Sequence, residues 1–333
     1  MRFGLSLLGS AQQPRTEDMR QRFGELLSYA HAARDAGYHH LTTGQHFLLD
    51  PLQMLQPVPL FARLIPETGD MRLVATLVLP VQSPVDLAET WATLDVLSGG
   101  RMTISAALGY RDVEYRAFGI PPAKRAKQFV DVIETVRELW TGEPVTRRGL
   151  GFDLQEAVCT IRPVQQPHPE IWIAANADVA VRRAATMGLD WNINAHATLD
   201  TVERQIAMYR GVAEEHGRSA VTFPMARELY CGRTREEAFA IAMPYLAPKY
   251  EAYSRWGQDK ALPDDDGVPE GFAELAAGRF IIGSPEDCAE EVERLRLMGV
   301  DRLHLRMGWP GMPIAQVLEG MERFAAEVMP RFV

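Results

Sequence analysis

Short apolar runs alternate with longer amphipathic stretches through most of the chain. Eight of the apolar runs predict strands, at residues 2–8, 40–43, 72–79, 102–107, 170–175, 190–194, 222–231 and 302–307. The helical spacing of apolar residues predicts helices between them, at residues 19–36, 123–141, 178–187, 199–216, 235–256 and 285–298. This alternation is typical of an α/β protein built from βαβ units around a parallel sheet.

The number of strands favours a closed barrel over an open sheet. Eight strands joined by right-handed crossovers fit a (β/α)8 TIM barrel. A doubly wound open sheet is the alternative, but Gly4 and Gly9 do not form the GxGxxG motif that such a sheet carries after its first strand. We therefore expect residues 1–333 to form one (β/α)8 barrel domain.

Two segments do not fit the alternation. Residues 142–169 read as a β-hairpin with a proline-rich exit, inserted between the fourth helix and the fifth strand. Residues 258–278 are acidic and rich in Gly and Pro, which predicts a mobile loop after the seventh strand. Such a loop is either a lid or simply disordered, and the sequence leaves both open.

Residues 83–119 predict a helix, a tight turn, a strand and a polar loop in direct succession. Ser83 can cap the helix at its start, and Gly99 can end it in the left-handed conformation. Polar loops directly after barrel strands are where barrel enzymes keep their chemistry. The loop after this fourth strand contains Gly109, Tyr110 and Arg111.

Composition excludes several classes of partner. The chain is 47% hydrophobic and 24% charged, as expected of a globular protein with a large core. A net charge of −9 argues against nucleic acid or an anionic membrane as a partner, and no apolar run approaches the roughly 20 residues that span a bilayer. The three cysteines are widely spaced without a CxxC pair, so we expect reduced thiols, a cytoplasmic protein and no metal site.

Polar residues at the other predicted strand ends are candidates for chemistry. Gln45 and His46 follow the second strand, where a histidine is either a general acid or base or a neutral residue bonded to its loop. After the fifth strand, Asn176 can cap a helix whose first N–H groups, with Ala177 and Asp178, would bind a phosphate. The Asp178 carboxylate would repel a phosphate unless it turns away.

The last three strands contribute candidates for substrate binding. A guanidinium beside an indole suits a planar or anionic ligand, although Arg306 could equally form a salt bridge with Glu228 across the barrel top. No GxSxG, HExxH, Walker or zinc-ligand motif is present. The candidates are Asn194, His196, Arg227, Arg306 and Trp309.

Several motifs in the same order resemble one protein family. SPVDLAETWATLDVLSGGRM, GYRDVEYRAFG and IIGSPEDCAEEVERLRLMGVDRLHL are similar to motifs of the bacterial luciferase-like flavin-dependent monooxygenases and oxidoreductases, and the resemblance covers nearly the whole chain. It implies a TIM barrel with the hairpin insertion and the mobile loop. It also implies a reduced flavin across the carboxyl end of the barrel, FMN or, in a sister branch, the deazaflavin F420.

The resemblance assigns the flavin site to particular residues. The phosphate would lie near residues 176–178, held by backbone donors or by Arg111, with the loop of residues 109–111 close by. Family members commonly have a cis peptide in the third strand, which would fall between Ala75 and Thr76. Luciferases carry two histidines after the second strand, whereas here Gln45 precedes a single His46, so light emission is not expected and FMN is favoured over F420.

The implied reaction is oxygenation of a small organic substrate with O2 and flavin reduced by a separate reductase or by NAD(P)H. His46 would assist proton transfer, and Asn194, His196 and Arg306 would position the substrate. The alternatives are F420-dependent hydride transfer and a non-catalytic flavin-binding protein. The family also implies a homodimer, for which Leu87, Trp91 and residues 55–64 are candidate apolar surface.

Overall fold

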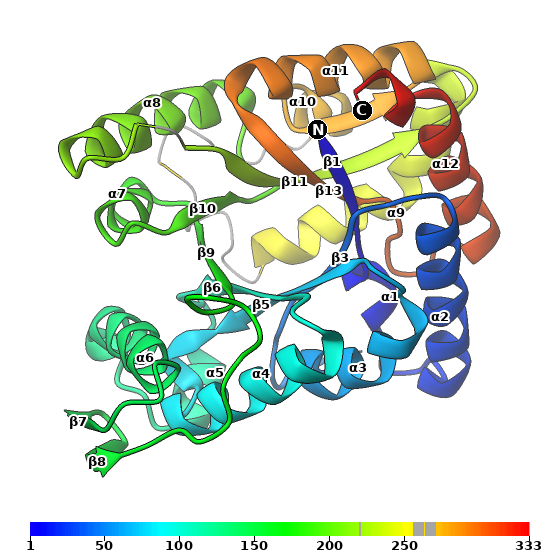
Figure 1. Ribbon diagram of the computed structural model, residues 1–333. Helices are drawn as coiled ribbons and strands as arrows, with labels where there is room; N and C mark the ends of the chain where they lie inside the picture. The colour runs from blue at the N-terminus through cyan, green and yellow to red at the C-terminus, as the bar shows by residue number, and fades with distance from the viewer. Residues whose placement is uncertain (220, 256–262, 264–270, 333) are drawn as a thin grey trace.

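Eight parallel strands close into a barrel in the computed structural model (Figure 1). The structure describes residues 1–219, 221–255, 263 and 271–332. Around the barrel the strands follow in the order β1, β3, β5, β6, β9, β10, β11 and β13, and pairing of Ile193 with Met225 closes the ring. The predicted (β/α)8 fold is therefore confirmed. The strands are β1 (Arg2–Ser6), β3 (His40–Thr43), β5 (Arg72–Val78), β6 (Met102–Ala107), β9 (Glu170–Ala175), β10 (Asp190–Ile193), β11 (Phe223–Cys231) and β13 (Val300–Arg306).

Helices surround the barrel on its outer face (Figure 1). The longer ones are α2 (Met19–Asp35), α4 (Pro84–Ser98), α6 (Arg125–Leu139), α7 (Asp178–Thr186), α8 (Leu199–Glu215), α9 (Arg235–Arg255), α11 (Pro285–Met298) and α12 (Ile314–Glu327). Shorter helices are α1 (Leu8–Ala11), α3 (Pro57–Leu64), α5 (Asp112–Ala117) and α10 (Phe272–Ala276). Two small strands, β2 (Gln12–Pro14) and β4 (Leu52–Met54), pair beside the barrel.

The predicted insertion is confirmed, and the predicted loop is only partly described. The strands β7 (Val145–Gly149) and β8 (Phe152–Ala157) form an antiparallel hairpin before β9. Of the predicted loop, residues 258–262 and 264–270 lie outside the described residues, and its last part contains α10. A strand that was not predicted, β12 (Phe280–Gly283), pairs with the second half of β11. No helix in the described part of the chain is long and apolar enough to cross a membrane.

Helix α4 begins and ends as predicted, but its apolar stripe faces inward. The Ser83 hydroxyl accepts from the Asp86 amide at 3.4 Å, and Gly99 ends the helix with φ +68°. Leu87 and Trp91 are buried within the chain, so the prediction that they form dimer surface is wrong. The apolar residues that α4 does expose are Val85, Val96 and Leu97.

Residues 55–64 also fail as exposed apolar surface. They include all of α3, whose Leu60, Phe61 and Leu64 are buried. An amphipathic helix and an interface helix show the same apolar spacing in sequence, and here the chain's own core takes the apolar face.

Side chains that alternate along the strands divide the barrel interior into two ends. Along β13, Arg302 contacts residues at the amino-terminal strand ends, and Arg306 contacts residues at the carboxyl ends. We call these ends the barrel floor and the barrel mouth. Between them, the His40 ring fills the space where a Cβ of Gly4 would lie, 2.3 Å from the imidazole, so only glycine fits there.

Candidate active site

A cavity of about 160 Å³ opens at the barrel mouth, between the end of β1 and helix α9. Its polar lining includes Gln12, Lys249 and Arg306, and most of its exposed lining surface is apolar. Gly9 also lines it, and a Cβ there would lie 1.8 Å from the carbonyl oxygen of Gly308. The two backbones therefore touch, which only glycine at position 9 permits.

A buried carboxylate organises the wall of this cavity. Lys249 Nζ lies 2.6 Å from Glu228 Oε1, and the Trp309 indole N–H donates to Oε2 at 2.6 Å. Arg306 lies 3.4 Å from the same carboxylate, and the Tyr250 hydroxyl donates to it at 3.4 Å. Glu228 is fully buried, so this network joins two cations and one anion away from bulk water.

Burial and charge shift the pKa values of this network. Burial favours the neutral form of Glu228, but the charges of Lys249 and Arg306 outweigh it and hold the pKa of the carboxyl below its usual range. Burial lowers the pKa of Lys249 to about 8, with Glu228 opposing that shift. Burial also lowers the pKa of His196 well below its usual range, and Arg306 adds to the effect. A desolvated lysine that titrates near neutral pH in a cleft is typical of a functional site.

Four of the five predicted substrate residues meet in this network. The Arg306 guanidinium donates to Asn194 Oδ1 at 3.2 Å and lies 3.5 Å from His196 Nε2, while Trp309 binds Glu228. Arg306 forms the salt bridge to Glu228 that the sequence offered as an alternative, and it also lines the cavity, so its role in binding a substrate stays a prediction.

Arg227 is the predicted substrate residue that points elsewhere. It neighbours Glu228 on β11, so its side chain leaves the opposite face of the strand, where it donates to the carbonyl oxygen of Asn194 at 3.3 Å. Lys249 was missed, because helix α9 brings it to the mouth from a stretch that reads as ordinary amphipathic helix. The signal available in sequence was Glu228, an acidic residue in a strand that is buried throughout.

A second polar cluster lies where β3 and β6 reach the mouth. His46 Nδ1 lies 3.1 Å from Glu114 Oε1, and the same oxygen accepts the Phe47 amide at 2.9 Å. Arg111 lies 3.3 Å from Glu114 and donates to the carbonyl oxygen of Phe47 at 2.6 Å. Arg111 thus holds the loop that carries His46, and Glu114, which was not predicted, is the buried acid that orients the imidazole.

The Glu114 carboxylate stays charged although it is buried. Burial raises its pKa, but the hydrogen bond and charge of His46, the Phe47 N–H and Arg111 together lower the pKa below the usual value. Gln45 has a different environment, since its Oε1 accepts the Val78 amide at 3.1 Å and the Gln82 side chain at 3.0 Å. Gln45 therefore fixes the end of β3 to the end of β5.

The expected cis peptide between Ala75 and Thr76 is wrong. Both cis bonds found in the described residues precede prolines, Pro51 and Pro167. Strand β5 instead continues with regular parallel pairing to β6 through Val78. Nearby, Gly109 has φ +83°, and a Cβ there would lie 2.7 Å from Val78 Cγ1, so the loop that carries Tyr110 needs glycine at this turn.

The start of helix α7 fits an anionic group. The N-cap residue is Ala177 and not Asn176 as predicted, and no side chain caps the helix. The Asp178 carboxylate turns toward helix α8, where Arg204 lies at 2.7 Å and Gln205 donates at 2.8 Å. The free N–H groups of this helix end are therefore available to a phosphate, and the nearby negative charge is paired.

The mouth carries groups of the kind that a flavin site uses. They are an uncapped helix end, a mostly apolar cavity and a histidine–carboxylate pair. Among the residues that the structure describes, no group of three or more His, Cys, Asp or Glu side chains could hold a metal ion.

The chain is similar to known flavin-dependent enzymes over most of its length. A family model described as luciferase-like monooxygenase matches residues 1–302. The oxygenase component of a flavin-dependent trigonelline monooxygenase from Acinetobacter baylyi is 23% identical over 95% of this chain and 91% of its own length. An FMNH2-dependent dimethylsulfone monooxygenase from Pseudomonas putida is 25% identical over 80% of each chain.

Solved structures share the barrel. The monooxygenase RslO1 from Streptomyces bottropensis superposes with a TM-score of 0.83 at 25% identity, covering 100% of both chains. An F420-dependent secondary alcohol dehydrogenase superposes with a TM-score of 0.76 at 19% identity, covering 99% of this chain and 98% of its own length, which shows that the two share the fold.

Proposed function

We propose that this chain, which belongs to the luciferase-like monooxygenase family, oxygenates a small organic substrate with O2 and reduced FMN. Membership in the family makes the chain an oxidoreductase. The observation that best supports oxygenation with reduced FMN is the pair of His46 and Glu114, whose Nδ1 and Oε1 atoms lie 3.1 Å apart. The uncapped start of α7 lies at the same end of the barrel.

The residues of the mouth would hold the flavin at two places. The N–H groups of Ala177 and Asp178 at the start of α7 would bind its phosphate. Residues at the ends of β5 and β6, including Thr76, Gly109 and Tyr110, would contact its ring. When bound, reduced FMN supplies the electrons that activate O2, and the protein supplies orientation and electrostatics.

The chain's own groups would then control protons and substrate. The His46 imidazole, held by Glu114, would donate or accept a proton at Nε2, because Nδ1 faces the carboxylate. Lys249 and Arg306 bring positive charge to the cavity wall, where both contact the Glu228 carboxylate. This charge would orient a substrate that carries a polar or anionic group, with Asn194 and His196 beside it.

The similarity to an oxygenase component supports a separate partner. We propose that a flavin reductase supplies reduced FMN by diffusion, and that the chain acts in the cytoplasm, where reduced flavin is available. We also propose a homodimer, which light scattering would test.

Three ligands separate this proposal from its alternatives. The purified protein is titrated with FMN, reduced FMN and F420, with absorbance and fluorescence as the readouts, and O2 uptake is followed after reduced FMN is added. We expect tighter binding of reduced FMN than of F420, and O2 uptake that depends on the protein. Binding of F420 alone, with hydride transfer and no O2 uptake, would replace the proposal with an F420-dependent oxidoreductase. Flavin binding without turnover of any kind would leave a binding protein.

A further inference from the structure

The barrel floor contains a second and larger cavity, of about 440 Å³. It lies at the amino-terminal strand ends, so the packed interior of the barrel separates it from the mouth. Its wall includes Arg2 of β1, Arg72 of β5 and Arg302 of β13, with His39 and His40 beside them. Barrel interiors are normally filled by layers of side chains, and a cavity of this size falls in the range of ligand pockets.

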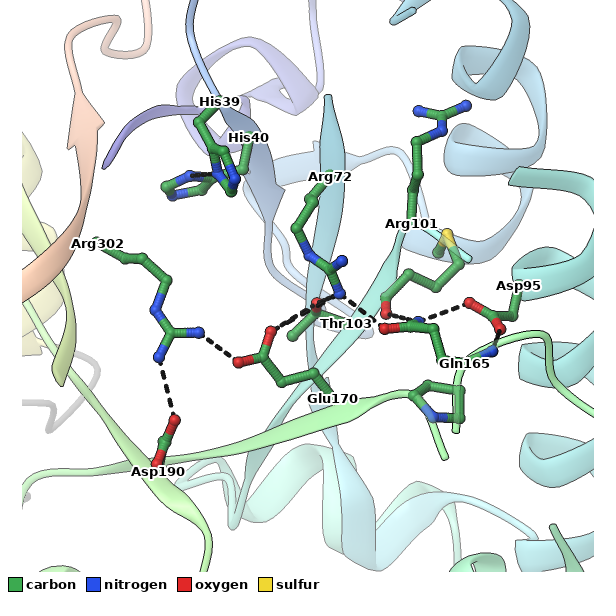
Figure 2. Close-up of polar contacts among 12 residues, drawn as sticks. His39, His40, Arg72, Asp95, Arg101, Thr103, Gln165, Glu170, Asp190 and Arg302 are labelled. Carbon is green, nitrogen blue, oxygen red and sulfur yellow. Dashed lines mark hydrogen bonds and ion pairs between the residues drawn. The ribbon is translucent and has the colours of Figure 1, made fainter. Parts of the chain in front are cut away.

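Ion pairs at the floor occupy the guanidinium group of Arg302. Arg302 pairs with Glu170 and lies 3.1 Å from Asp190, and its guanidinium stacks over the Trp172 ring at 4.9 Å. Figure 2 shows Glu170 between Arg302 and Arg72. Arg302 is therefore fixed by groups on β9 and β10 and has little left to offer a ligand.

The guanidinium groups of Arg72 and Arg2 still have N–H donors to offer a ligand. Arg72 uses one terminal nitrogen, which donates to Gln165 at 2.9 Å and to Thr103 at 3.1 Å, and it lies 3.7 Å from Glu170. The Arg2 side chain has no hydrogen bond or ion pair to any residue that the structure describes, and Arg2 is exposed. Asp301 pairs with Arg302, and Arg218 pairs with Asp190, which adds one negative and one positive charge to the cluster. The cluster then has four arginines and three carboxylates, so the floor keeps an excess positive charge.

The histidines add hydrogen-bonding capacity without adding charge. Burial lowers the pKa of His39 below its usual value and that of His40 well below it, so both are neutral at pH 7. Their Nδ1 atoms lie 3.2 Å apart, so one donates to the other. The Nε2 of His40 is buried and has no partner among the described residues.

We propose that the barrel floor is a binding site for a small oxyanion, a carboxylate or a phosphate, held by Arg2 and Arg72. Guanidinium groups match the two oxygens of such an anion, and the charge-assisted hydrogen bonds they form are among the stronger ones in proteins. The ion pairs of Arg302 keep the wall rigid, and Gln165, whose amide donates to Asp95 at 2.7 Å, fixes the segment beside Arg72. The site is separate from the flavin mouth and does not depend on the proposed function.

Calorimetric titration tests this site directly. Inorganic phosphate and succinate are titrated separately at constant ionic strength into the whole protein, and the tighter of the two identifies the oxyanion. We expect Arg2→Gln to weaken binding about tenfold, the loss of one charge-assisted contact. Arg2 has no partner to lose, so this variant keeps its fold. Arg72→Gln should weaken binding similarly, and Arg72→Lys, which keeps the charge, should weaken it less.

Two control variants separate the floor from other sources of binding. Arg20→Gln removes an exposed charge from α2, and Arg204→Gln alters the start of α7 at the mouth. Both should leave the affinity unchanged. An affinity that falls with Arg204→Gln but not with Arg2→Gln would locate the anion at the mouth and overturn the proposal. Equal losses in Arg2→Gln and Arg20→Gln, or no binding of either anion at millimolar concentration, would also overturn it.

Discussion

Strand β13 places an arginine at each end of the barrel, and the two ends use it differently. At the floor, Arg302 meets Glu170 and Asp190, whose side chains are 32% and 25% exposed, so water shares in their solvation. At the mouth, Arg306 and Lys249 share one carboxylate, that of Glu228, which is 0% exposed. A partly hydrated ion-pair cluster is expected to stabilise the fold, whereas a fully desolvated one costs free energy and is retained for function.

The largest expected effect comes from removing the carboxylate at the mouth. Glu228→Gln removes the buried carboxylate that Lys249 and Arg306 share, so we expect a loss of about 3 kcal/mol in the free energy of unfolding. Urea denaturation measures it, and Tyr230→Phe on the same strand is the control with a small expected change. A loss below about 1 kcal/mol would mean that water reaches the network and that the contrast between the two ends is wrong.

The next effect concerns catalysis at the mouth and not stability. His46→Ala removes the proposed proton donor, so turnover with reduced FMN should fall about a hundredfold, a typical contribution of general acid–base catalysis. Glu114→Gln is the matched variant, because it keeps an acceptor for the Phe47 amide and should lower turnover less. Unchanged turnover and unchanged release of hydrogen peroxide in His46→Ala would remove this residue from the mechanism.

Replacing Arg302 at the barrel floor should affect stability and not turnover. Arg302→Gln loses its charge-assisted contacts with Glu170 and Asp190, which should lower the free energy of unfolding by about 2 kcal/mol. Turnover per folded molecule should stay the same, because the floor takes no part in the proposed reaction. A tenfold fall in turnover with the fold intact would show that the two ends are coupled through β13.

The sequence predicts structure that depends on neighbouring residues better than it predicts contacts between separate elements, and the two ends of the barrel depend on both. All eight barrel strands and the hairpin follow from alternation and turn residues, since those signals lie within a few neighbouring positions. The salt bridge between Arg306 and Glu228 was one of two interpretations of the sequence. The contact of Lys249 with Glu228 was not predicted, because Lys249 reaches the carboxylate from a different element and its helical spacing carries no sign of that contact. The same limit explains Leu87 and Trp91, whose apolar stripe could face a partner or the chain's own core, and only packing decides between them.

Between the two ends, His304 should make stability depend on pH. Burial lowers its pKa to about 3, with Arg306 and Arg302 adding to the effect, from an ordinary value of 6.5. The unfolded chain therefore binds a proton that the folded chain does not, so stability is full above pH 6.5 and falls as the pH drops toward 3. From pH 7 to 5.5 this one group should cost about 1 kcal/mol. Urea denaturation of His304→Gln at both pH values should show a pH difference smaller by that amount, and an equal difference would contradict the assignment.

The smallest expected effect tests where the mouth holds a phosphate. Asp178 carries a negative charge at the first turn of α7, and its pairing with Arg204 leaves both side chains 42% exposed. Asp178→Asn should change stability by less than about 0.5 kcal/mol, because exposed ion pairs contribute little. If a flavin phosphate lies at this helix start, removing the carboxylate also removes a repulsion, so FMN should bind about threefold more tightly at low salt, and less so as salt screens the charges. Asp86→Asn, in the first turn of α4, is the matched control and should leave FMN affinity unchanged. Weaker binding in Asp178→Asn, or the same gain in Asp86→Asn, would place the phosphate elsewhere at the mouth.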